Sequence, residues 1–265
     1  MKEKSGVLKA FYKLSPVILP ILLLILWEIA SRAGIIRPTI LPAPGKILSA
    51  AGNLISKGTL QTDIGISLSR VVKGYVFGAA LGVTVGILMG IFPIVERILC
   101  LLTDIFRPIP IVAWVPVLIL WMGIDESSKV TVIAIGTFWP VLLNVTDGIR
   151  NVDVKYKEVA FVLRKNMWIT LTKVIFPAAL PQIFTGLRVG VGTAWVSVIG
   201  AELIASSSGL GYLISYSREL SQPANMLVGV FSIGLIGMLI NKILVQLEKH
   251  SLKWNVNLKS IADDF

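Results

Sequence analysis

Long apolar runs separated by short polar segments dominate this chain. Residues 74–95 and 220–241 are each stretches of 22 residues without a charged side chain. A membrane-spanning helix needs about 20 predominantly apolar residues. The pattern predicts six spans, at residues 16–33, 71–92, 98–122, 130–146, 183–205 and 226–247. We expect the third span to be kinked or broken, because it contains Asp104, Arg107, Pro108, Pro110 and Pro116.

Composition agrees with a membrane protein. Of the 265 residues, 55% are hydrophobic and 15% are charged, whereas soluble domains carry about 25% charged residues. These values exclude a disordered chain, a coiled coil and a nucleic-acid-binding tail protein, and they predict no nucleic-acid partner. The predicted fold class is an all-α integral membrane protein with six transmembrane helices.

The net charge of +10 is informative about topology. With the N-terminus inside, the inside segments hold 15 of the 25 Lys and Arg residues and the outside segments hold 6. This bias predicts that both termini are cytoplasmic. The expected parts are a cytoplasmic segment at 1–15, a membrane domain at 16–247 and a cytoplasmic tail at 248–265. The basic start before the first apolar run resembles a signal peptide, but it lacks an Ala-x-Ala cleavage pattern, so we expect an uncleaved first helix.

Two outer segments have their own patterns. Residues 34–65 contain a Pro-rich turn followed by an amphipathic stretch that we expect along the outer membrane surface. Its predicted apolar face consists of Ile47, Leu48, Ala51, Leu54 and Ile55. The Ser- and Gly-rich residues 206–222 predict an outer loop or a re-entrant turn.

The second predicted span carries a glycine at every fourth position. These residues are Gly74, Gly78, Gly82, Gly86 and Gly90. They share one helix face, which allows another helix backbone to approach closely. Tight helix packing is the simpler interpretation, and a sliding surface in a moving transporter is the alternative.

The inside loop at 151–181 predicts two short helices. Asn151 or Asp153 can cap the first helix. Lys165 and Asn166 can end it, and a second helix is predicted from 167 to 175, stopped by Pro177 and Pro181. From periodicity alone, a helix pair resting on anionic lipid and a docking surface for a cytoplasmic partner are both possible.

Motifs along most of the chain resemble one family. The sequence Glu158-Val159-Ala160, with Pro177 following 17 residues after Ala160, resembles the EAA loop of ABC-importer permeases. Further similar motifs lie, in order, at 41–44, 67–75, 107–116, 120–124, 138–140, 177–181, 186–188, 201–202 and 209–214. Together they resemble the sulfonate, nitrate and taurine branch of these permeases, which implies a MetI-like type I importer fold with a core at about 60–245.

The resemblance implies partners and roles. It implies an ABC ATPase dimer that binds the ATP, an extracytoplasmic solute-binding protein, a second permease copy and surrounding lipid, with no cofactor of this chain's own. It assigns ATPase coupling to Glu158, Val159, Ala160, Arg164, Lys165 and Pro177. One position departs from the family, since Arg164 replaces a glycine. Arg164 would then turn without left-handed geometry, or Asn166 would take the turning role.

Polar residues inside spans are candidates for function. Possible pathway residues are Arg188, Trp195 and Glu202; for Arg188 and Glu202, bonding between helices is equally possible. For Glu28 we expect an interfacial position, and for Asp104 and Arg107 an ion pair on one helix face. The single cysteine, Cys100, excludes an intrachain disulfide, and its apolar neighbours predict a buried thiol.

Other function classes lack their residues. The only histidine, His250, follows the last predicted span, so an intramembrane serine protease has no base, and no H-E-x-x-H metal motif exists. No P-loop is present, so energy must come from another subunit. We therefore expect a non-enzymatic permease subunit that imports a small anionic solute, with sulfonates or taurine first and nitrate next. The alternatives are a stand-alone secondary transporter and a six-span substrate-binding transport subunit.

Overall fold

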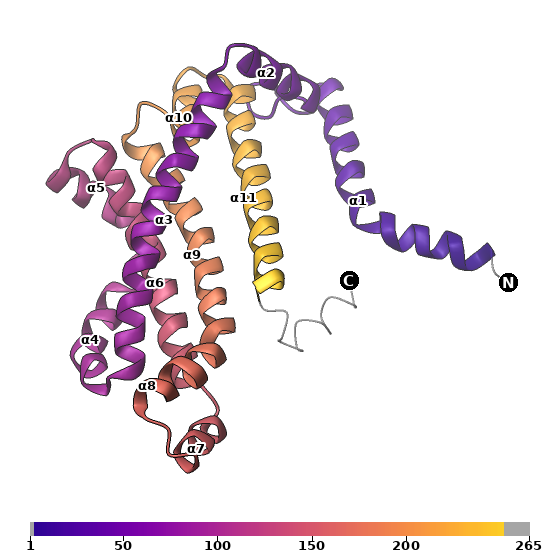
Figure 1. The fold of residues 1–265 in the computed structure, drawn as a ribbon. Helices are drawn as coiled ribbons and strands as arrows, with labels where there is room; N and C mark the ends of the chain where they lie inside the picture. Colours follow the sequence, from indigo (N-terminus) through magenta and orange to yellow (C-terminus); the bar gives the residue numbers. More distant parts are fainter. Residues whose placement is uncertain (1–2, 252–265) are drawn as a thin grey trace. The chain divides into compact units, whose positions relative to one another are not determined.

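The computed structural model describes residues 3–251, and their side chains from 18 to 250 except 157 and 249. Helix is the only regular structure in this part of the chain, as the all-α prediction required (Figure 1). The helices are α1 (Glu3–Arg32), α2 (Pro44–Ser56), α3 (Thr59–Ile91), α4 (Pro93–Phe106), α5 (Ile111–Met122), α6 (Glu126–Arg150), α7 (Val154–Val162), α8 (Met167–Thr170), the π-helical turn η1 (Leu171–Ile175), α9 (Phe176–Ala205), α10 (Leu210–Glu219) and α11 (Pro223–Ser251). Most of the predicted tail at 248–265 lies outside the described residues.

The chain divides into two compact units. The first comprises Met1–Asp63 and Leu213–Ser232, and the second comprises Ile64–Tyr212 and Ile233–Phe265. Helices α3, α10 and α11 each contribute residues to both units. We call these parts unit 1 and unit 2, and each is described by itself.

Four helical segments of the described chain are long and apolar enough to cross a membrane. They lie at Thr59–Ile91, Glu126–Arg150, Met167–Glu219 and Pro223–Glu248. These segments contain three of the six predicted spans, at 130–146, 183–205 and 226–247, and cover all but the last residue of a fourth, at 71–92. The predicted first span, at 16–33, overlaps α1 and stays a prediction, because some of its side chains are outside the described set.

The predicted third span is broken, as its prolines indicated. Helices α4 and α5 meet at a bend of 97°. The break covers Arg107 to Pro110, because Pro108 and Pro110 lack the backbone N–H groups that would continue the helix. Pro116, in contrast, lies inside α5 without ending it.

The start of α3 differs from the prediction. The helix begins at Thr59, twelve positions before the predicted boundary at 71. The intervening residues include polar side chains, which a hydropathy pattern places outside the membrane. Ser67 and Arg70 are nevertheless buried, with exposures of 0% and 2%, because hydrogen bonds within unit 2 satisfy them.

Unit 1 joins the end of α1 to the start of α2. The Glu28 carboxylate accepts hydrogen bonds from Arg32 Nε at 2.6 Å and from the backbone N of Gly45 at 3.0 Å. The predicted interfacial role of Glu28 therefore includes a structural bond. On the predicted apolar face of α2, Ile47 and Leu54 are buried, as is the neighbouring Ala50, while Leu48 and Ile55 are exposed.

The glycine face of α3 packs directly on α6 in unit 2. A Cβ atom added at Gly82 would lie 2.9 Å from both the Phe138 carbonyl oxygen and the Val141 Cβ, and one at Gly86 would lie 2.8 Å from the Val145 Cβ. Real Cβ atoms essentially never approach so closely. The other three glycines face α6 in the same way, at Gly74, Gly78 and Gly90. Tight packing, the simpler of the two interpretations, is therefore confirmed.

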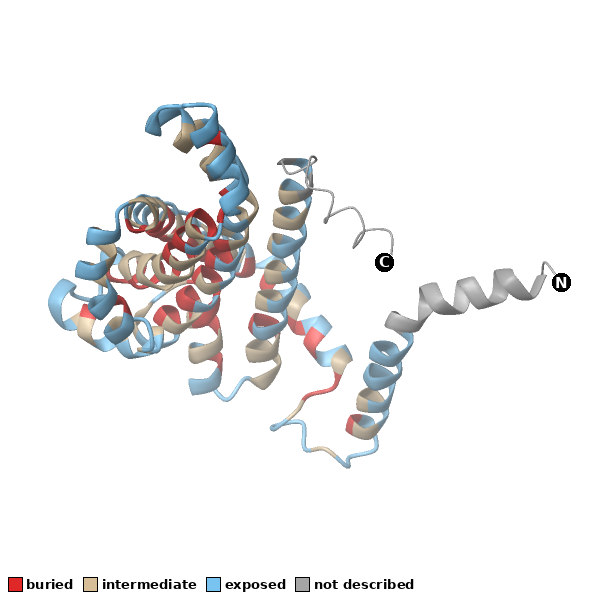
Figure 2. Cartoon of the chain, turned by 90° about the horizontal axis from the view of Figure 1, so that it is seen from below, coloured by how far each residue is buried: buried red, intermediate tan, exposed pale blue. Residues whose placement is uncertain are grey.

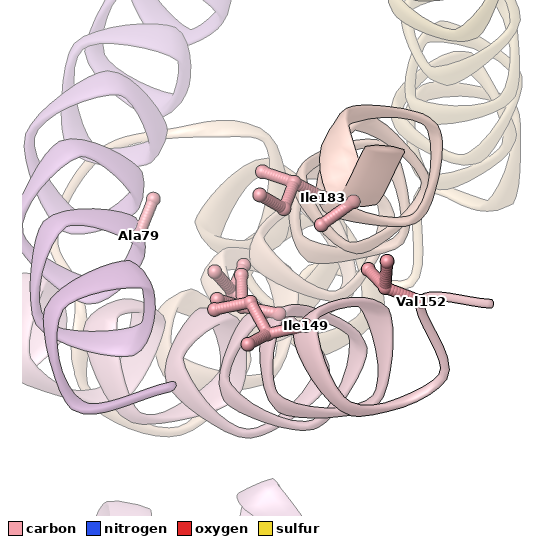
Figure 3. Close-up of a cluster of buried hydrophobic side chains, with 7 residues drawn as sticks. Ala79, Ile149, Val152 and Ile183 are labelled. Atoms are coloured by element: carbon pink, nitrogen blue, oxygen red, sulfur yellow. The ribbon is translucent and has the colours of Figure 1, made fainter. Parts of the chain in front are cut away.

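A compact apolar cluster fills the end of unit 2 near residue 150. Figure 3 shows side chains of this cluster from α3, α6, the segment after α6, and α9 pointing toward one another. Its buried members are Ala79, Val141, Val145, Ile149, Val152, Ala179 and Ile183. Buried positions gather where helices pack, and exposed positions cover the outer faces (Figure 2). The cluster fixes both ends of the loop that runs from α6 to α9.

Candidate functional site

Helix α7 projects from the end of unit 2, beyond α8 (Figure 1). It begins after Asp153, whose side-chain Oδ1 accepts a hydrogen bond from the Lys155 backbone N at 2.9 Å. This bond satisfies one of the N–H groups that the first turn leaves unpaired. Of the two predicted caps, Asn151 and Asp153, it is therefore Asp153 that caps α7.

Arg164 ends α7 in a left-handed conformation, with φ 49°. The Lys165 N donates to the Ala160 carbonyl at 3.0 Å, and the Arg164 N donates to the Phe161 carbonyl at 2.9 Å. This pair of bonds is the Schellman motif, which places a left-handed residue, usually glycine, after the helix. The expectation that Arg164 would avoid left-handed geometry is wrong. The motif satisfies helix carbonyls, and an arginine can adopt the conformation at a cost of about 1 kcal/mol.

Asn166 starts the second helix of the loop. Its φ of −71° is not left-handed, and its side-chain Oδ1 accepts from the Ile169 backbone N at 2.8 Å. Asn166 is therefore an N-cap and does not take over the turning role of the missing glycine.

The predicted stop at Pro177 and Pro181 is also wrong. Helix α8 continues through the π-helical turn at Leu171–Ile175 directly into α9. The Phe176 N donates back to the Leu171 carbonyl, five residues earlier. This widened turn accommodates Pro177, which has no N–H to donate, at the start of α9. Movement of α8 is thus coupled to α9 without an intervening loop.

The surface of α7 and α8 is apolar and open to its surroundings. Phe161 is 84% exposed, and Trp168 is 72% exposed. The other exposed apolar side chains are Val154, Tyr156, Val159, Val162, Leu163, Met167 and Ile169. Ala160 is the exception and is buried. An exposed apolar patch of this kind is typical of an interaction site. We call it the loop patch.

The loop patch carries charges that nothing within the described chain neutralises. Glu158, Arg164 and Lys165 are all exposed. None of the three forms an ion pair with any residue that the structure describes. The structure therefore brings these predicted residues together with Val159 on one projecting surface. Pro177, the last predicted member, lies apart in the first turn of α9.

The second candidate region is a buried ion network around Glu202. The Glu202 carboxylate accepts from Arg70 Nη1 at 2.8 Å, from the Gly211 N at 2.9 Å and from Ser67 Oγ at 2.8 Å and 2.9 Å. Arg70 also donates to the Ser208 carbonyl at 2.8 Å and forms a two-pronged ion pair with Glu126. The network joins α3, α6, α9 and the start of α10.

From the sequence, a pathway role and bonding between helices were equally possible for Glu202. The structure shows that Glu202 forms bonds between helices. Its side chain is fully buried, and its oxygens are used by Ser67, Arg70 and Gly211. Sequence reasoning missed Ser67, Arg70 and Glu126 as its partners. A signal was available, because Ser67 and Arg70 lie three apart on one helix face beside the second span. No local pattern, however, links them to Glu202, 132 residues after Arg70.

The other two possible pathway residues also bond to neighbouring helices. Arg188 Nη1 donates to Glu248 at 2.7 Å, which joins α9 to α11. Trp195 is 7% exposed, and its indole Nε1 donates to the Ile233 carbonyl at 3.2 Å. The structure therefore distributes Arg188, Trp195 and Glu202 over three separate contacts.

Two further expectations are wrong. Asp104 and Arg107 are exposed and form no ion pair within the described residues, because α4 ends between them at Phe106. Cys100 is exposed, not buried. Its apolar neighbours Ile98, Leu101 and Leu102 are exposed as well, so none of the described helices covers this face of α4.

Comparisons with known proteins agree on one family. The profile of binding-protein-dependent transport system inner membrane components matches residues 78–253. The chain is 38% identical to the aliphatic sulfonates transport permease protein SsuC of Bacillus subtilis, over 96% of this chain and 92% of the relative. It is 33% identical to the taurine transport system permease protein TauC of Escherichia coli, over 89% and 88%. In fold it is similar to an amino acid ABC transporter crystallised with histidines, with a TM-score of 0.65, 15% identity and coverage of 76% of this chain and 97% of that one.

Proposed function

This chain belongs to the family of binding-protein-dependent transport system inner membrane components, and we propose that it moves small solutes with a compact oxyanion group into the cell. It is a multi-pass permease subunit of an ABC importer, with the MetI-like type I fold. Its family implies ATPase and solute-binding-protein partners. We further propose which substrate it carries, which surfaces contact its partners, how it is oriented in the membrane and that it pairs with a second copy.

The loop patch is the observation that carries the proposed mechanism. It presents large apolar side chains beside Glu158, Arg164 and Lys165, which have no ion-pair partners among the described residues. A mixed patch of this kind suits a protein partner, because apolar contacts stabilise the complex and charges set its specificity. We assign the patch to the ATPase, whose subunits bind the ATP while this chain contributes no catalytic residue.

Helix continuity supports a lever mechanism. The loop begins at the end of α6. After α7, the chain runs from α8 through η1 into α9 without a non-helical break. Helices α6 and α9 pack extensively on each other, and α7 contacts η1. Closure of the ATPase dimer would therefore displace α7 and α8 and tilt α9, which switches the access of the pathway between the two sides of the membrane.

The substrate class follows from the named relatives. The names of SsuC and TauC refer to aliphatic sulfonates and to taurine. Taurine, like the aliphatic sulfonates, carries a sulfonate group. We therefore place sulfonates and taurine first and nitrate next. The binding protein would deliver the solute from outside.

The proposed orientation places the loop patch in the cytoplasm. Inside segments carry 15 basic residues against 6 outside, which favours cytoplasmic termini and a cytoplasmic 151–181 loop. The exposed apolar face of α4 and the other uncovered helix faces suit lipid and a second permease copy. We propose a homodimer on an ATPase dimer.

The test is purification of the tagged permease from its own host in mild detergent, followed by reconstitution. We expect an ATPase to co-purify and, with the binding protein added, ATP-dependent uptake of radiolabelled taurine or ethanesulfonate into proteoliposomes. Glu158→Lys should abolish uptake while leaving the complex intact. Uptake that proceeds without ATP and without a co-purifying ATPase would instead indicate a stand-alone secondary transporter.

A further inference from the structure

Unit 2 contains a cavity at the break between α4 and α5. Its volume is about 330 Å³, several times the roughly 30 Å³ that one water molecule occupies in the liquid. Arg107 and Ile109 reach it from the break, Gly136 and Trp139 from α6, and Thr193 and Ser197 from α9. The cavity is therefore large enough for a small solute, and residues of α5, α6 and α9, which belong to predicted spans, line it while leaving it open to its surroundings.

The charge on the cavity wall is positive. Among the described residues that line the cavity, Arg107 is the only charged one, and none is a carboxylate. The Arg107 side chain is exposed and has no ion-pair partner among the described residues. Trp139 lines the cavity with its ring, but its indole Nε1 is buried away from the open space and is therefore not counted as a donor to a ligand.

The two hydroxyl groups on α9 add polar character without adding charge. Ser197 Oγ donates to the Thr193 carbonyl at 2.7 Å, and Thr193 Oγ1 donates to the Gly190 carbonyl at 3.0 Å. Each of these hydroxyls can rotate to donate to a ligand instead. The remaining lining residues are isoleucine, valine, proline and glycine, so the rest of the wall is apolar.

We propose that this cavity holds the oxyanion group of the solute as it crosses the membrane. The Arg107 guanidinium binds the anion through charge-assisted hydrogen bonds, and the Thr193 hydroxyl is the second donor. A planar guanidinium matches the oxygen atoms of a sulfonate or nitrate. The proposal rests on the proposed function, and it names a site other than Arg188, Trp195 and Glu202, none of which lines the cavity.

Two glycines on the cavity wall differ in a way that supplies a steric test. A Cβ atom at Gly136 would collide with Ser197 Oγ and lie 3.2 Å from Ser197 Cβ, so the Ser197 side chain would have to move. A Cβ atom at Gly192 would meet no heavy atom within 4 Å. A larger side chain at Gly192 therefore extends into open space beside the cavity without displacing a neighbour. Gly234 on α11 is equally open but does not line the cavity, which makes it a matched control.

The experiment measures binding to the purified permease–ATPase complex without the binding protein, so that affinity reports on the membrane subunit. Radiolabelled taurine is titrated by scintillation proximity, and unlabelled ethanesulfonate and nitrate compete with it. We expect Arg107→Gln to weaken binding about tenfold, as for loss of a hydrogen bond to a charged group, and Arg107→Lys to restore most of it. Thr193→Val, which keeps the shape of the side chain but removes the hydroxyl, should weaken binding about threefold. Gly192→Leu should remove binding, and Gly234→Leu should leave it unchanged.

The outcomes separate this proposal from the proposed function. Wild-type affinity in both Arg107→Gln and Gly192→Leu would overturn the assignment of the cavity. A wild-type complex that binds none of the three anions, yet imports one of them with ATP and the binding protein, would also overturn it and leave the proposed function intact. Absence of ATP-dependent uptake by the wild type would refute the proposed function by a measurement that does not involve the cavity variants.

Discussion

The α3–α6 interface and the loop patch contain similar apolar residues, which are buried in the interface and exposed on the patch. Along α3, five glycines bring α6 so close that Ile133, Val141 and Val145 are completely buried. On α7, comparable side chains such as Val159 and Val162 are exposed. Residue type therefore does not distinguish the two regions. The difference is that the interface has its partner in the same chain, whereas no described residue covers the patch, which we propose binds another subunit.

Charged residues follow the same division. Arg70 and Glu202 are buried and saturated with hydrogen bonds, while Glu158, Arg164 and Lys165 are exposed without ion pairs among the described residues. Buried charges are tolerated only when they are paired and hydrogen-bonded. Changes at the interface or in the ion network should thus reduce stability, and changes on the patch should affect coupling. Four substitutions test this contrast, ordered by their expected effect on stability.

Gly82→Leu should have the largest effect. Its side chain would collide with the Phe138 carbonyl and Val141 on α6, and we expect a loss of more than about 3 kcal/mol together with failed assembly in detergent. Gly65→Leu is the control, because Gly65 lies on the same helix with no heavy atom within 4 Å of an added Cβ. Thermal unfolding and size-exclusion chromatography measure both variants. Equal stability of the two would show that the close contact is not required.

Glu202→Ala should destabilise the protein by about 3 kcal/mol, because it leaves Ser67 Oγ, the Gly211 N and part of the Arg70 guanidinium without their acceptor. Glu126→Gln is the comparison, since the Glu126 side chain is 62% exposed and an exposed pair contributes at most about 1 kcal/mol. Both are measured as shifts in thermal unfolding. A larger shift for Glu126→Gln would contradict the view that the buried partner dominates the network.

Arg164→Gly should stabilise the chain by about 1 kcal/mol, because glycine adopts the left-handed conformation at φ 49° without steric cost. Arg164→Ala separates this effect from the loss of charge, since alanine removes the guanidinium but keeps the Cβ. We expect the alanine variant to show no such gain in thermal stability. A stabilised alanine variant would mean that charge, and not backbone conformation, determines the effect.

Glu158→Lys should change stability least, by less than about 0.5 kcal/mol, because the side chain is exposed and has no ion-pair partner among the described residues. Its effect should appear in coupling, as ATP hydrolysis without transport in the reconstituted complex. Glu219→Lys, an exposed charge reversal outside the patch, should leave transport unchanged. Normal transport by Glu158→Lys would remove the patch from the coupling mechanism.

Local sequence patterns predicted much of this architecture. The apolar runs at 71–92 and 226–247 coincide with the end of α3 and with α11, and the prolines at 108 and 110 mark the bend between α4 and α5. Four-residue glycine spacing predicted the close approach of another helix, because spacing along a helix fixes which residues share a face, and the structure identifies that helix as α6. The Asp153 cap was likewise visible, since capping involves residues only two apart.

Features that depend on distant residues could not be predicted in the same way. The sequence marked Glu202 as unusual but not its bond to Arg70, and the exposure of Cys100 depends on which helices cover α4. The left-handed Arg164 was unexpected because intrinsic preference favours glycine there, while the hydrogen bonds of the helix end prevail.

The sequence by itself determined the membrane class, most of the helices, the glycine face and the family resemblance, because these depend on hydropathy and on spacings within one helix. Only the tertiary structure decided that the Glu202 carboxylate bonds to Arg70, that α8 runs into α9 through a π-helical turn, and that the break before α5 opens a cavity lined by Arg107 and Trp139. The physical reason is that burial, ion pairing and cavity shape are set by contacts between residues far apart in the chain, and these contacts exist only once the helices have packed.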